Sequence, residues 1–385
     1  MDFNLNKEQK DIARAAREFA EGEFSDRAEE LDREETFDET VFKKAAELGF
    51  IGVCISEKYG GQSMSILENC LIVEEFSAVD LGMAISVLVA VYGSEVIQEF
   101  GTEAQKRKFL PPLTKGKTIM GTAFTESDAG SDLAGATLTT AVREGDEYII
   151  NGSKMFITNG NRADYLLCFV QTDPDNPDIH KRHSMILVET DREGFEATKL
   201  TGKMGVRASD TAEISFNNVR VPSSNLVGNQ GNGFYQAMWS FNTNRVTVAA
   251  QAVGLASSAL EESIKHVEKR KAFGSPLSSY QSIQFKLADM YTMIHAGRNL
   301  VYEAALRVDQ GKPDPKLTAA AKSFCGQMVV KCADMALQMH GGYGYLAEYK
   351  VQRIYRDAKV LEIYEGTTEI ERIIIARNLL SKKKR

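Results

Sequence analysis

The sequence lacks the patterns that bind metals, cross-link chains or bind nucleic acid. Its five cysteines show no CxxC spacing and lie mostly in apolar surroundings, so we expect reduced core thiols in a reducing compartment. Its five histidines form no ligand pattern beyond His180 and His183 in a polar stretch, and we predict no metal site. A formal net charge of -7 argues against general nucleic-acid binding, which needs a basic face.

Signals for export and membrane insertion are also missing. No stretch approaches about 18 apolar residues, and residues 1–5 carry neither a basic region nor an apolar signal core. We therefore expect a cytoplasmic protein that does not enter a membrane, with residues 382–385 as a solvated basic tail. With 385 residues, 43% of them hydrophobic and 26% charged, the chain is long enough for two or three soluble domains.

Three blocks of different texture follow one another. Residues 1–119 read as a helical domain with capping boxes that begin at Asn6, Ser65 and Thr102. In this block Gly49 is expected to end a helix that starts near residue 38, and the apolar stretch 83–97 predicts one buried central helix.

Residues 120–230 predict an antiparallel β domain. A turn is expected at residues 144–146, and Asn151-Gly152 is a strong hairpin signal. The expected β runs are 137–143, 148–150, 154–158, 165–171, 184–189 and 213–221.

Residues 231–385 predict an antiparallel four-helix bundle, with long helices over 234–270, 279–310 and 315–340 and a last one from residue 368. The fold class is therefore α+β, with helices, then strands, then helices. This order and the absence of a GxGxxG fingerprint exclude a Rossmann fold.

One carboxylate stands out near the C-terminus, in the run Tyr364-Glu365-Gly366-Thr367-Thr368 beside the apolar residues 360–363. Partial desolvation would raise the pKa of Glu365 above its ordinary value of about 4.3 and make it a stronger base. Gly366 lets a flat ligand approach the backbone, and Thr367 can donate a hydrogen bond to it. The run predicts a proton-abstracting site built against a planar cofactor.

Several motifs together resemble the acyl-CoA dehydrogenase flavoprotein family, over essentially the full length of the chain. The matching segments are 122–132, 151–159, 270–274 with Gln281, 338–344, 353–358 and 364–367. The resemblance implies a homotetramer, a dimer of dimers, with FAD at a subunit interface. It also implies α,β-dehydrogenation of an acyl-CoA thioester, with electrons passed to an electron-transferring flavoprotein.

The resemblance also implies roles for single residues. Glu365 is the base that takes the α-proton while flavin N5 takes the β-hydride, and residues 241–245, where some members place the base, hold no carboxylate. The implied FAD contacts are Phe124, Thr125, Gly130, Ser131, Phe156, Thr158, Arg270, Phe273, Gln281, Gln338, Gly342, Thr367 and Glu369. The implied substrate contacts are Ser131, Asn242, Arg245, Tyr364, Gly366 and Tyr92.

Three positions depart from the family's frequent residues: Phe156 stands for a tryptophan, Asn242 for an aspartate and Ala272 for a threonine. Residues 85–93, which are expected to wall the acyl pocket, contain no arginine that could pair with a terminal carboxylate. A dicarboxylic acyl group is therefore disfavoured, and short, branched or alicyclic acyl groups fit best. Tyr92 and Trp239 are candidates for setting the pocket depth, although both also suit a plain core role.

Two other functions stay open at this point. The first is an acyl-CoA oxidase or related flavin enzyme that reacts with oxygen, because nothing in the sequence reports solvent access to a flavin. The second is a non-catalytic FAD- or CoA-binding protein, against which the retained Glu365 speaks. The sequence names neither the acyl group, nor the physiological electron acceptor, nor the pathway.

Overall fold

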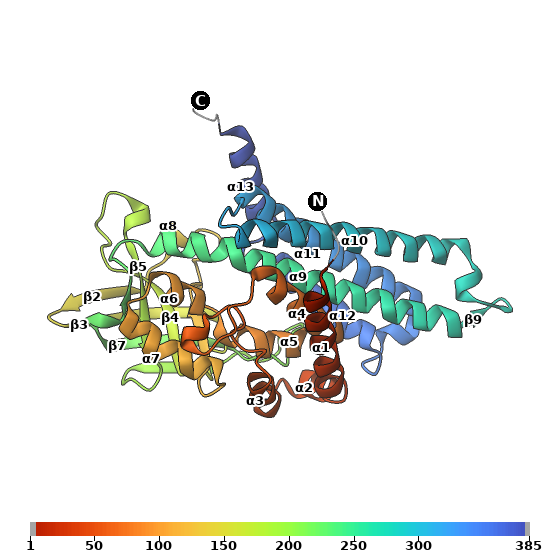
Figure 1. Ribbon diagram of the computed structural model, residues 1–385, viewed down its shortest axis with the longest axis horizontal. Helices are drawn as coiled ribbons and strands as arrows, with labels where there is room; N and C mark the ends of the chain where they lie inside the picture. The colour runs from red at the N-terminus through yellow and green to blue at the C-terminus, as the bar shows by residue number, and fades with distance from the viewer. Residues whose placement is uncertain (1–4, 382–385) are drawn as a thin grey trace.

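The computed structural model describes residues 5–381, so the expected basic tail at 382–385 and the first residues lie outside the described part. The chain begins with a helical block, seen in red to orange in Figure 1. Asn6, Ser65 and Thr102 each form the predicted capping box, and Gly49 follows the third helix with a φ of 80°. The helices of this block are α1 (Lys7–Phe24), α2 (Ala28–Glu34), α3 (Glu39–Glu47), α4 (Ile66–Val79), α5 (Leu81–Leu88), α6 (Ser94–Phe100) and α7 (Glu103–Thr114).

The prediction of one helix over 83–97 is wrong, because the chain breaks between α5 and α6. A 3-10 turn (Val89–Val91) follows α5, and Gly93 then adopts a φ of 100°. A side chain at Gly93 would place its Cβ 2.8 Å from Met120, so both the backbone conformation and the space require glycine. The stretch Leu81–Phe100 is, against our expectation, long and apolar enough to cross a membrane, but 78% of its apolar window is buried inside the protein.

The middle of the chain forms a twisted sheet, most of whose pairings are antiparallel. The strand order is β6-β7-β3-β2-β4-β5-β8, and β1 pairs in parallel with β4. The strands are β1 (Met120–Ala123), β2 (Thr140–Glu144), β3 (Glu147–Thr158), β4 (Tyr165–Gln171), β5 (His183–Glu189), β6 (Phe195–Lys199), β7 (Thr211–Pro222) and β8 (Leu226–Val227), with the short helix α8 (Leu133–Ala136) after β1.

The hairpin prediction at Asn151-Gly152 is wrong. These two residues lie inside β3, where the register against β7 shifts, and the turn sits at Gly145-Asp146 between β2 and β3. Gly152 has a φ of 139°, and a Cβ there would meet Thr139 at 2.6 Å. The glycine therefore serves a bulge with a close backbone approach, which is the other common use of glycine in a strand.

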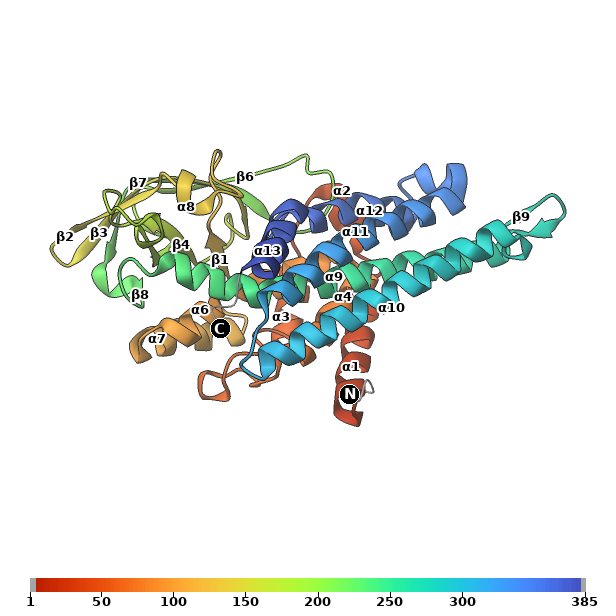
Figure 2. The same ribbon diagram turned by 90° about the horizontal axis from the view of Figure 1, so that it is seen from above.

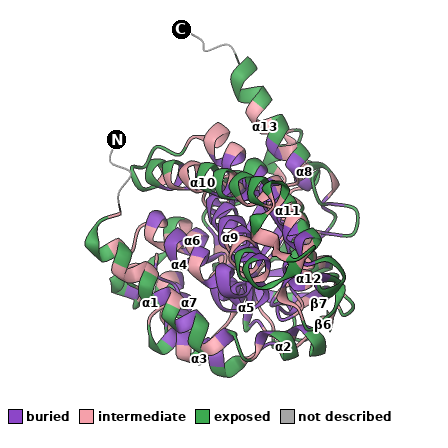
Figure 3. Ribbon diagram, turned by 90° about the vertical axis from the view of Figure 1, so that its right-hand side faces the viewer, coloured by how far each residue is buried: buried purple, intermediate pink, exposed green. Residues whose placement is uncertain are grey.

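Long helices return after the sheet: α9 (Gly233–Lys269), α10 (Gln281–Asp309), α11 (Pro315–His340), α12 (Lys350–Ala358) and α13 (Thr368–Leu380). Helix α9 runs from the β domain along the bundle to a small hairpin of β9 (Lys271–Ala272) and β10 (Ser275–Pro276) at the opposite end (Figures 1 and 2). Helix α4 of the first block packs against α9, so it joins the bundle. Figure 3 shows the buried residues gathered on α4, α5 and α9 at the centre.

The parts of the chain share their cores. The largest apolar cluster joins α1, α4 and α5 to α9, α10 and α11, and a second joins α6, α7 and the first turns of α9 to one face of the sheet. Buried charges add further ties, since Arg353 of α12 lies 2.9 Å from Asp80, and Asp357 accepts a hydrogen bond from the Val206 N–H at 2.6 Å. These contacts fix the helices of both blocks relative to the sheet.

Candidate active site

The loop before α13 holds Glu365 in an unusual backbone conformation. Glu365 has a φ of 54° and Gly366 a φ of 105°, so two successive residues adopt left-handed geometry. The loop is fixed at one end by the Thr367 side chain, which accepts a hydrogen bond from the Ile370 N–H as the N-cap of α13. A non-glycine residue pays strain in this region, and such strain concentrates at functional sites.

The Glu365 side chain is partly buried. Its Oε2 is buried and has no hydrogen-bond partner among the described residues. Burial raises the pKa of Glu365 to about 7, with the charge of Glu95 acting in the same direction and those of Arg245 and Lys322 acting against it. A carboxylate with a pKa near neutrality is suited to act as a general base.

Aromatic side chains flank this carboxylate. The hydroxyl of Tyr92, at the break between α5 and α6, is also buried without a partner among the described residues. The pKa of Tyr92 lies well above its ordinary value because of burial and then of the charge of Glu365. Tyr364 donates its hydroxyl hydrogen bond to Gln251 of α9. Two buried polar atoms without partners among the described residues thus lie close enough to interact electrostatically, as expected where a ligand would lie.

Two buried cations, Arg245 and Lys322, contact the main chain of the same loop. Arg245 of α9 places its Nε 3.4 Å from the Glu365 carbonyl oxygen and 2.9 Å from Oε1 of Glu371. Lys322 of α11 donates a hydrogen bond to the Gly366 carbonyl. Arg245 is only 4% exposed, so the predicted contact with coenzyme A would have to be made from this buried position. Asn242 lies one helical turn earlier on α9 and is partly exposed.

A loop of the β domain reaches toward α9 from the other side. Phe124 packs its ring 5.4 Å from that of Phe241, and Thr125 accepts a hydrogen bond from the Met155 N–H at 2.8 Å. Gly130 and Ser131 follow on the same loop and are exposed. Lys154 anchors this loop, because its buried Nζ contacts the Phe124 carbonyl at 3.0 Å and Glu126 at 2.8 Å.

Strand β3 presents the other β-domain candidates. Phe156 has a φ of 61° at a register shift of β3, and its side chain is 66% exposed. Phe156 is therefore not a core residue of the sheet, because an unusual backbone conformation holds this large aromatic outward. Thr158 is half-buried two residues further and pairs with Thr211 of β7.

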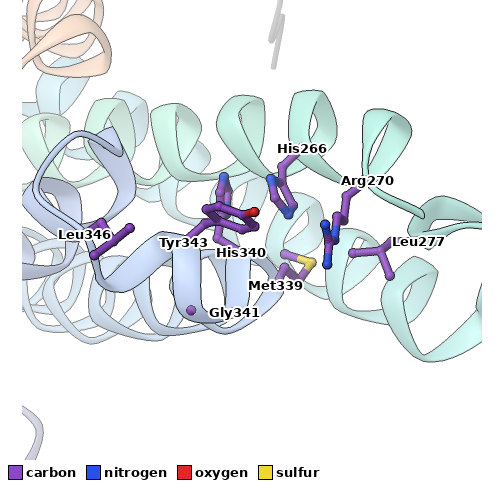
Figure 4. Close-up of a pocket in the computed structure, with 9 residues that line it drawn as sticks. His266, Arg270, Leu277, Met339, His340, Gly341, Tyr343 and Leu346 are labelled. Carbon is purple, nitrogen blue, oxygen red and sulfur yellow. The ribbon is translucent and has the colours of Figure 1, made fainter. Parts of the chain in front are cut away.

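A second group of predicted residues lies at the far end of the bundle. A cavity of about 400 Å³ is formed there between the ends of α9 and α11, and Figure 4 shows His266, Arg270, His340 and Tyr343 around it. The Arg270 guanidinium lies over the Tyr343 ring at 5.6 Å, and among the described residues no carboxylate forms an ion pair with it. Gly342 lines this cavity.

Three more candidates surround that end of the molecule. Phe273, at the tip between β9 and β10, has a φ of 49° and a fully exposed side chain. Gln281 starts α10, and Gln338 is exposed at the end of α11. Thr367 and Glu369 lie elsewhere, in a smaller cavity of about 280 Å³ at the start of α13.

Comparison with known proteins decides the family. Models described as the N-terminal, middle and C-terminal domains of acyl-CoA dehydrogenase match residues 6–117, 121–219 and 231–380. The chain belongs to the acyl-CoA dehydrogenase family. It is an FAD oxidoreductase of the class that acts on CH–CH groups, and the three-part fold predicted from the sequence is confirmed.

Relatives of this acyl-CoA dehydrogenase match over nearly their whole length. Acryloyl-CoA reductase (NADH) of Anaerotignum propionicum is 42% identical over 384 residues, which cover 99% of this chain and 97% of the relative. Butyryl-CoA dehydrogenase from Megasphaera elsdenii has a TM-score of 0.95 at 39% identity, covering 99% of this chain and 100% of that one. A structure described as "Electron transferring flavoprotein of Acidaminococcus fermentans: Towards a mechanism of flavin-based electron bifurcation" has a TM-score of 0.96 at 41% identity, covering 99% and 100%.

Sequence reasoning missed four polar residues of the acyl-CoA dehydrogenase site. They are Glu95, Gln251, Lys322 and Glu371. Lys322 had a visible signal, because it is the single charged residue in the stretch 317–329 and a buried lysine must be paired. Glu371 had none, since an acidic residue in the first turn of a helix is ordinary.

Proposed function

We propose that this enzyme removes the α-proton and the β-hydride from a short-chain, branched or alicyclic acyl-CoA thioester and forms the 2-enoyl-CoA, with Glu365 as the base. The observation that carries the proposal is the Glu365 carboxyl group, whose Oε2 is buried without a partner among the described residues and whose pKa is raised to about 7 by burial. Near pH 7 such a group is about half deprotonated and able to take a proton.

The main chain at Glu365 offers a second element of the reaction. The Glu365 N–H has no acceptor among the described residues, and the left-handed φ of 54° holds it in place. A free N–H beside the base can hold the thioester oxygen as negative charge develops on it. We assign Tyr364 and Gly366 to the walls of the thioester slot, and Ser131, Asn242 and Arg245 to the coenzyme A side.

The described residues fit FAD in their chemistry. Arg270 offers to a diphosphate a cation that has no carboxylate partner among residues 5–381, and the exposed Phe156 offers an aromatic face to a flavin ring. We assign Phe124, Thr125, Gly130, Ser131, Phe156 and Thr158 to the flavin end and Arg270, Phe273, Gln281, Gln338 and Gly342 to the adenosine diphosphate end. Thr367 and Glu369, which lie apart from that end at the start of α13, are proposed as further FAD contacts. When bound, the flavin accepts the hydride from the substrate β-carbon.

The distance between the residues near Glu365 and those at the far cavity supports an FAD site that is shared by two chains. Arg245, beside Glu365, and Arg270, at the far cavity, are separated by 25 helical residues, which is about 37 Å at 1.5 Å per residue. One FAD cannot contact both ends of the same chain, so a second copy supplies one of the two groups. The fully exposed Phe273 suits such an interface. We propose the family's homotetramer, a dimer of dimers, on this basis.

The acyl side of the proposed pocket is apolar. The buried residues of α5 and the following 3-10 turn, from Ile85 to Val89, carry no cation, and Arg245 is already paired with Glu371. A terminal carboxylate on the substrate would be buried without a partner, which is costly. We propose that Tyr92 limits the depth of this pocket. Trp239 packs edge-on against Phe100 at 5.3 Å and stays a weaker candidate.

The proposed electron acceptor is an electron-transferring flavoprotein, and the proposed location is the cytoplasm. The acceptor is supported by the likeness to a chain of the Acidaminococcus fermentans structure. A second candidate for the direction of reaction is reduction of a 2-enoyl-CoA. It is favoured by the 42% identity to a protein named acryloyl-CoA reductase (NADH). The same base and slot serve both directions, because each step is reversible.

Anaerobic mixing of the flavin-loaded enzyme with straight, branched and alicyclic acyl-CoAs tests the proposal. We expect flavin bleaching with at least one short apolar acyl-CoA and none with glutaryl-CoA. Glu365→Gln should retain flavin and bleach at least about 100-fold more slowly, as expected for loss of a general base. Glu196→Gln, an exposed glutamate of β6, is the matched control and should bleach at the wild-type rate. Wild-type bleaching by Glu365→Gln would rule out this assignment of the base.

A further inference from the structure

Beneath the Glu365 loop lie three buried charges, of which two, Glu371 and Lys322, have no role in the proposed reaction. Glu371, in the first turn of α13, is 0% exposed, and Lys322 of α11 is 1% exposed. Arg245 of α9 lies between the loop and Glu371, with 2.9 Å between its Nε and Oε1 of Glu371. Three helices thus bring two cations and one anion under a loop that carries a second anion, Glu365.

These charges touch the loop through its main chain. Arg245 lies 3.4 Å from the Glu365 carbonyl, and Lys322 donates to the Gly366 carbonyl. Glu371 packs directly against Gly366, because a Cβ at that glycine would lie 2.3 Å from Oε1 of Glu371. The cations therefore bind the carbonyls of the two left-handed residues, whereas the carboxylate of Glu365 forms no ion pair among the described residues.

The charge state of Glu371 determines which carboxylate forms an ion pair with Arg245. A guanidinium in a buried site needs a carboxylate partner, and two carboxylates, those of Glu365 and Glu371, are within its influence. Arg245 forms an ion pair with Glu371, whereas its contact with Glu365 is a hydrogen bond to the main-chain carbonyl. If Glu371 were neutral, Glu365 would be the remaining acidic partner, and an Arg245–Glu365 pair would hold the base in its ionised form and weaken it.

We propose that Glu371 is a positioning residue that retains Arg245 and thereby leaves the Glu365 carboxylate unpaired and basic. This inference rests on the proposed role of Glu365 as the base. Several charged groups influence the pKa values of Glu371 and Glu365. Glu371 is faced by Arg245, Lys322 and Glu365, and Glu365 is faced in addition by Glu95 of α6. Burial raises the pKa of Glu371 itself to about 7, although the charges of Arg245 and Lys322 oppose that shift.

The first test uses the flavin-loaded Glu371→Gln variant and the pH dependence of flavin reduction in single turnover. An opposite charge within about 4–6 Å lowers a carboxyl pKa by about 1–3 units. We therefore expect the midpoint of the acid limb to move down by at least about one pH unit, and the plateau rate at high pH to fall because the base is weaker. Glu196→Gln should keep the wild-type midpoint. An unchanged or raised midpoint in Glu371→Gln overturns the proposal.

A second readout does not depend on turnover. The difference in Tm between Glu365→Gln and its parent, followed from pH 5 to pH 9, reports the pKa of Glu365 in the folded protein. In the wild type, where this pKa is raised, the parent should lose stability relative to Glu365→Gln as pH rises, until the difference levels off near pH 7. On a Glu371→Gln background the difference should level off at lower pH. The same curve on both backgrounds overturns the proposal.

Two outcomes separate this inference from the proposed function. If Glu365→Gln reduces its flavin as fast as the wild type, the proposed base is wrong and the positioning role falls with it. If only Glu365→Gln is slow and Glu371→Gln leaves both curves unmoved, the function stands and the positioning role alone fails. Should Glu371→Gln not fold, Glu371→Asp, with its carboxylate withdrawn from Arg245, is expected to give a smaller shift in the same direction, and no shift overturns the proposal.

Discussion

Replacing Lys154 by methionine tests how the β domain holds the loop that carries Phe124 and Thr125. The Lys154 side chain is fully buried and contacts Glu126 at 2.8 Å, the Phe124 carbonyl at 3.0 Å and the Phe169 carbonyl at 2.6 Å. Although burial alone would raise the pKa of Glu126, the charge of Lys154 lowers it, so Glu126 is ionised at neutral pH. Lys154→Met therefore leaves a buried carboxylate without its cation.

The expected loss is about 3–5 kcal/mol, which is typical of breaking one side of a buried ion pair. At roughly 2.1 cal/mol/K per residue, this lowers Tm by about 4–6 °C if all 385 residues unfold together. If the β domain unfolds by itself, the shift is larger and appears as a separate transition. Thermal unfolding by circular dichroism measures both cases, and flavin fluorescence in the same ramp reports whether flavin is released earlier.

Two further variants make the reasoning refutable. Lys115→Met, which removes an exposed lysine, should leave Tm unchanged. The double variant Lys154→Met with Glu126→Gln should be more stable than Lys154→Met alone, because the uncompensated charge is gone, although the single glutamine oxygen can accept from only one of the backbone N–H groups of Leu138 and Thr139. A double variant that loses the sum of the two single losses would refute the assignment of this cost to an unpaired charge.

Two predictions concern the Glu365 loop. Because Glu365 must be deprotonated to accept a proton and its pKa is raised to about 7, flavin reduction by a preferred acyl-CoA should fall about tenfold per pH unit below pH 7; a rate that is constant from pH 5 to pH 8 would contradict this. Gly366→Ala should slow flavin reduction at least about tenfold, since it adds strain of about 1–2 kcal/mol at a φ of 105° and a contact of 2.3 Å to Glu371. Gly202→Ala, at a φ of 76° with nothing within 4 Å, carries strain without contact, and an equal effect on rate from both changes would contradict the reasoning.

Short sequence signals gave correct predictions where the structure that they specify depends on neighbouring residues. The capping boxes at Asn6, Ser65 and Thr102 all form, and the helix over 315–340 begins and ends as predicted, because Pro315 suits a first turn and Gly341 ends the helix. Tyr165–Gln171 is likewise the predicted strand, since a run of that length that is apolar up to its last residue suits a central strand of a buried sheet.

Signals that depend on tertiary contacts were misread. Asn151-Gly152 resembles a hairpin turn, but its glycine is needed because Thr139 of the neighbouring segment lies too close for a side chain. The apolar stretch 83–97 resembles one helix, but Met120 of β1 occupies the space at Gly93 and the chain must break there. In both cases the partner is distant in sequence, so the pattern alone could not reveal which use of glycine applies.

The candidate site also combines features that are visible in adjacent residues with contacts from residues that are distant in sequence. Glu365 was singled out because its aromatic, glycine and hydroxyl neighbours are adjacent in sequence, whereas the charges that shift its pKa come from α6, α9 and α11. Desolvation by itself raises the pKa of a buried carboxyl group, while a cation beside it lowers the pKa again. For Glu365 to keep a pKa near 7, Arg245 and Lys322 must therefore contact the loop while groups other than the Glu365 carboxylate bind their charges. In this protein Gly366 and Glu371 occupy them, and the base is left free for the substrate.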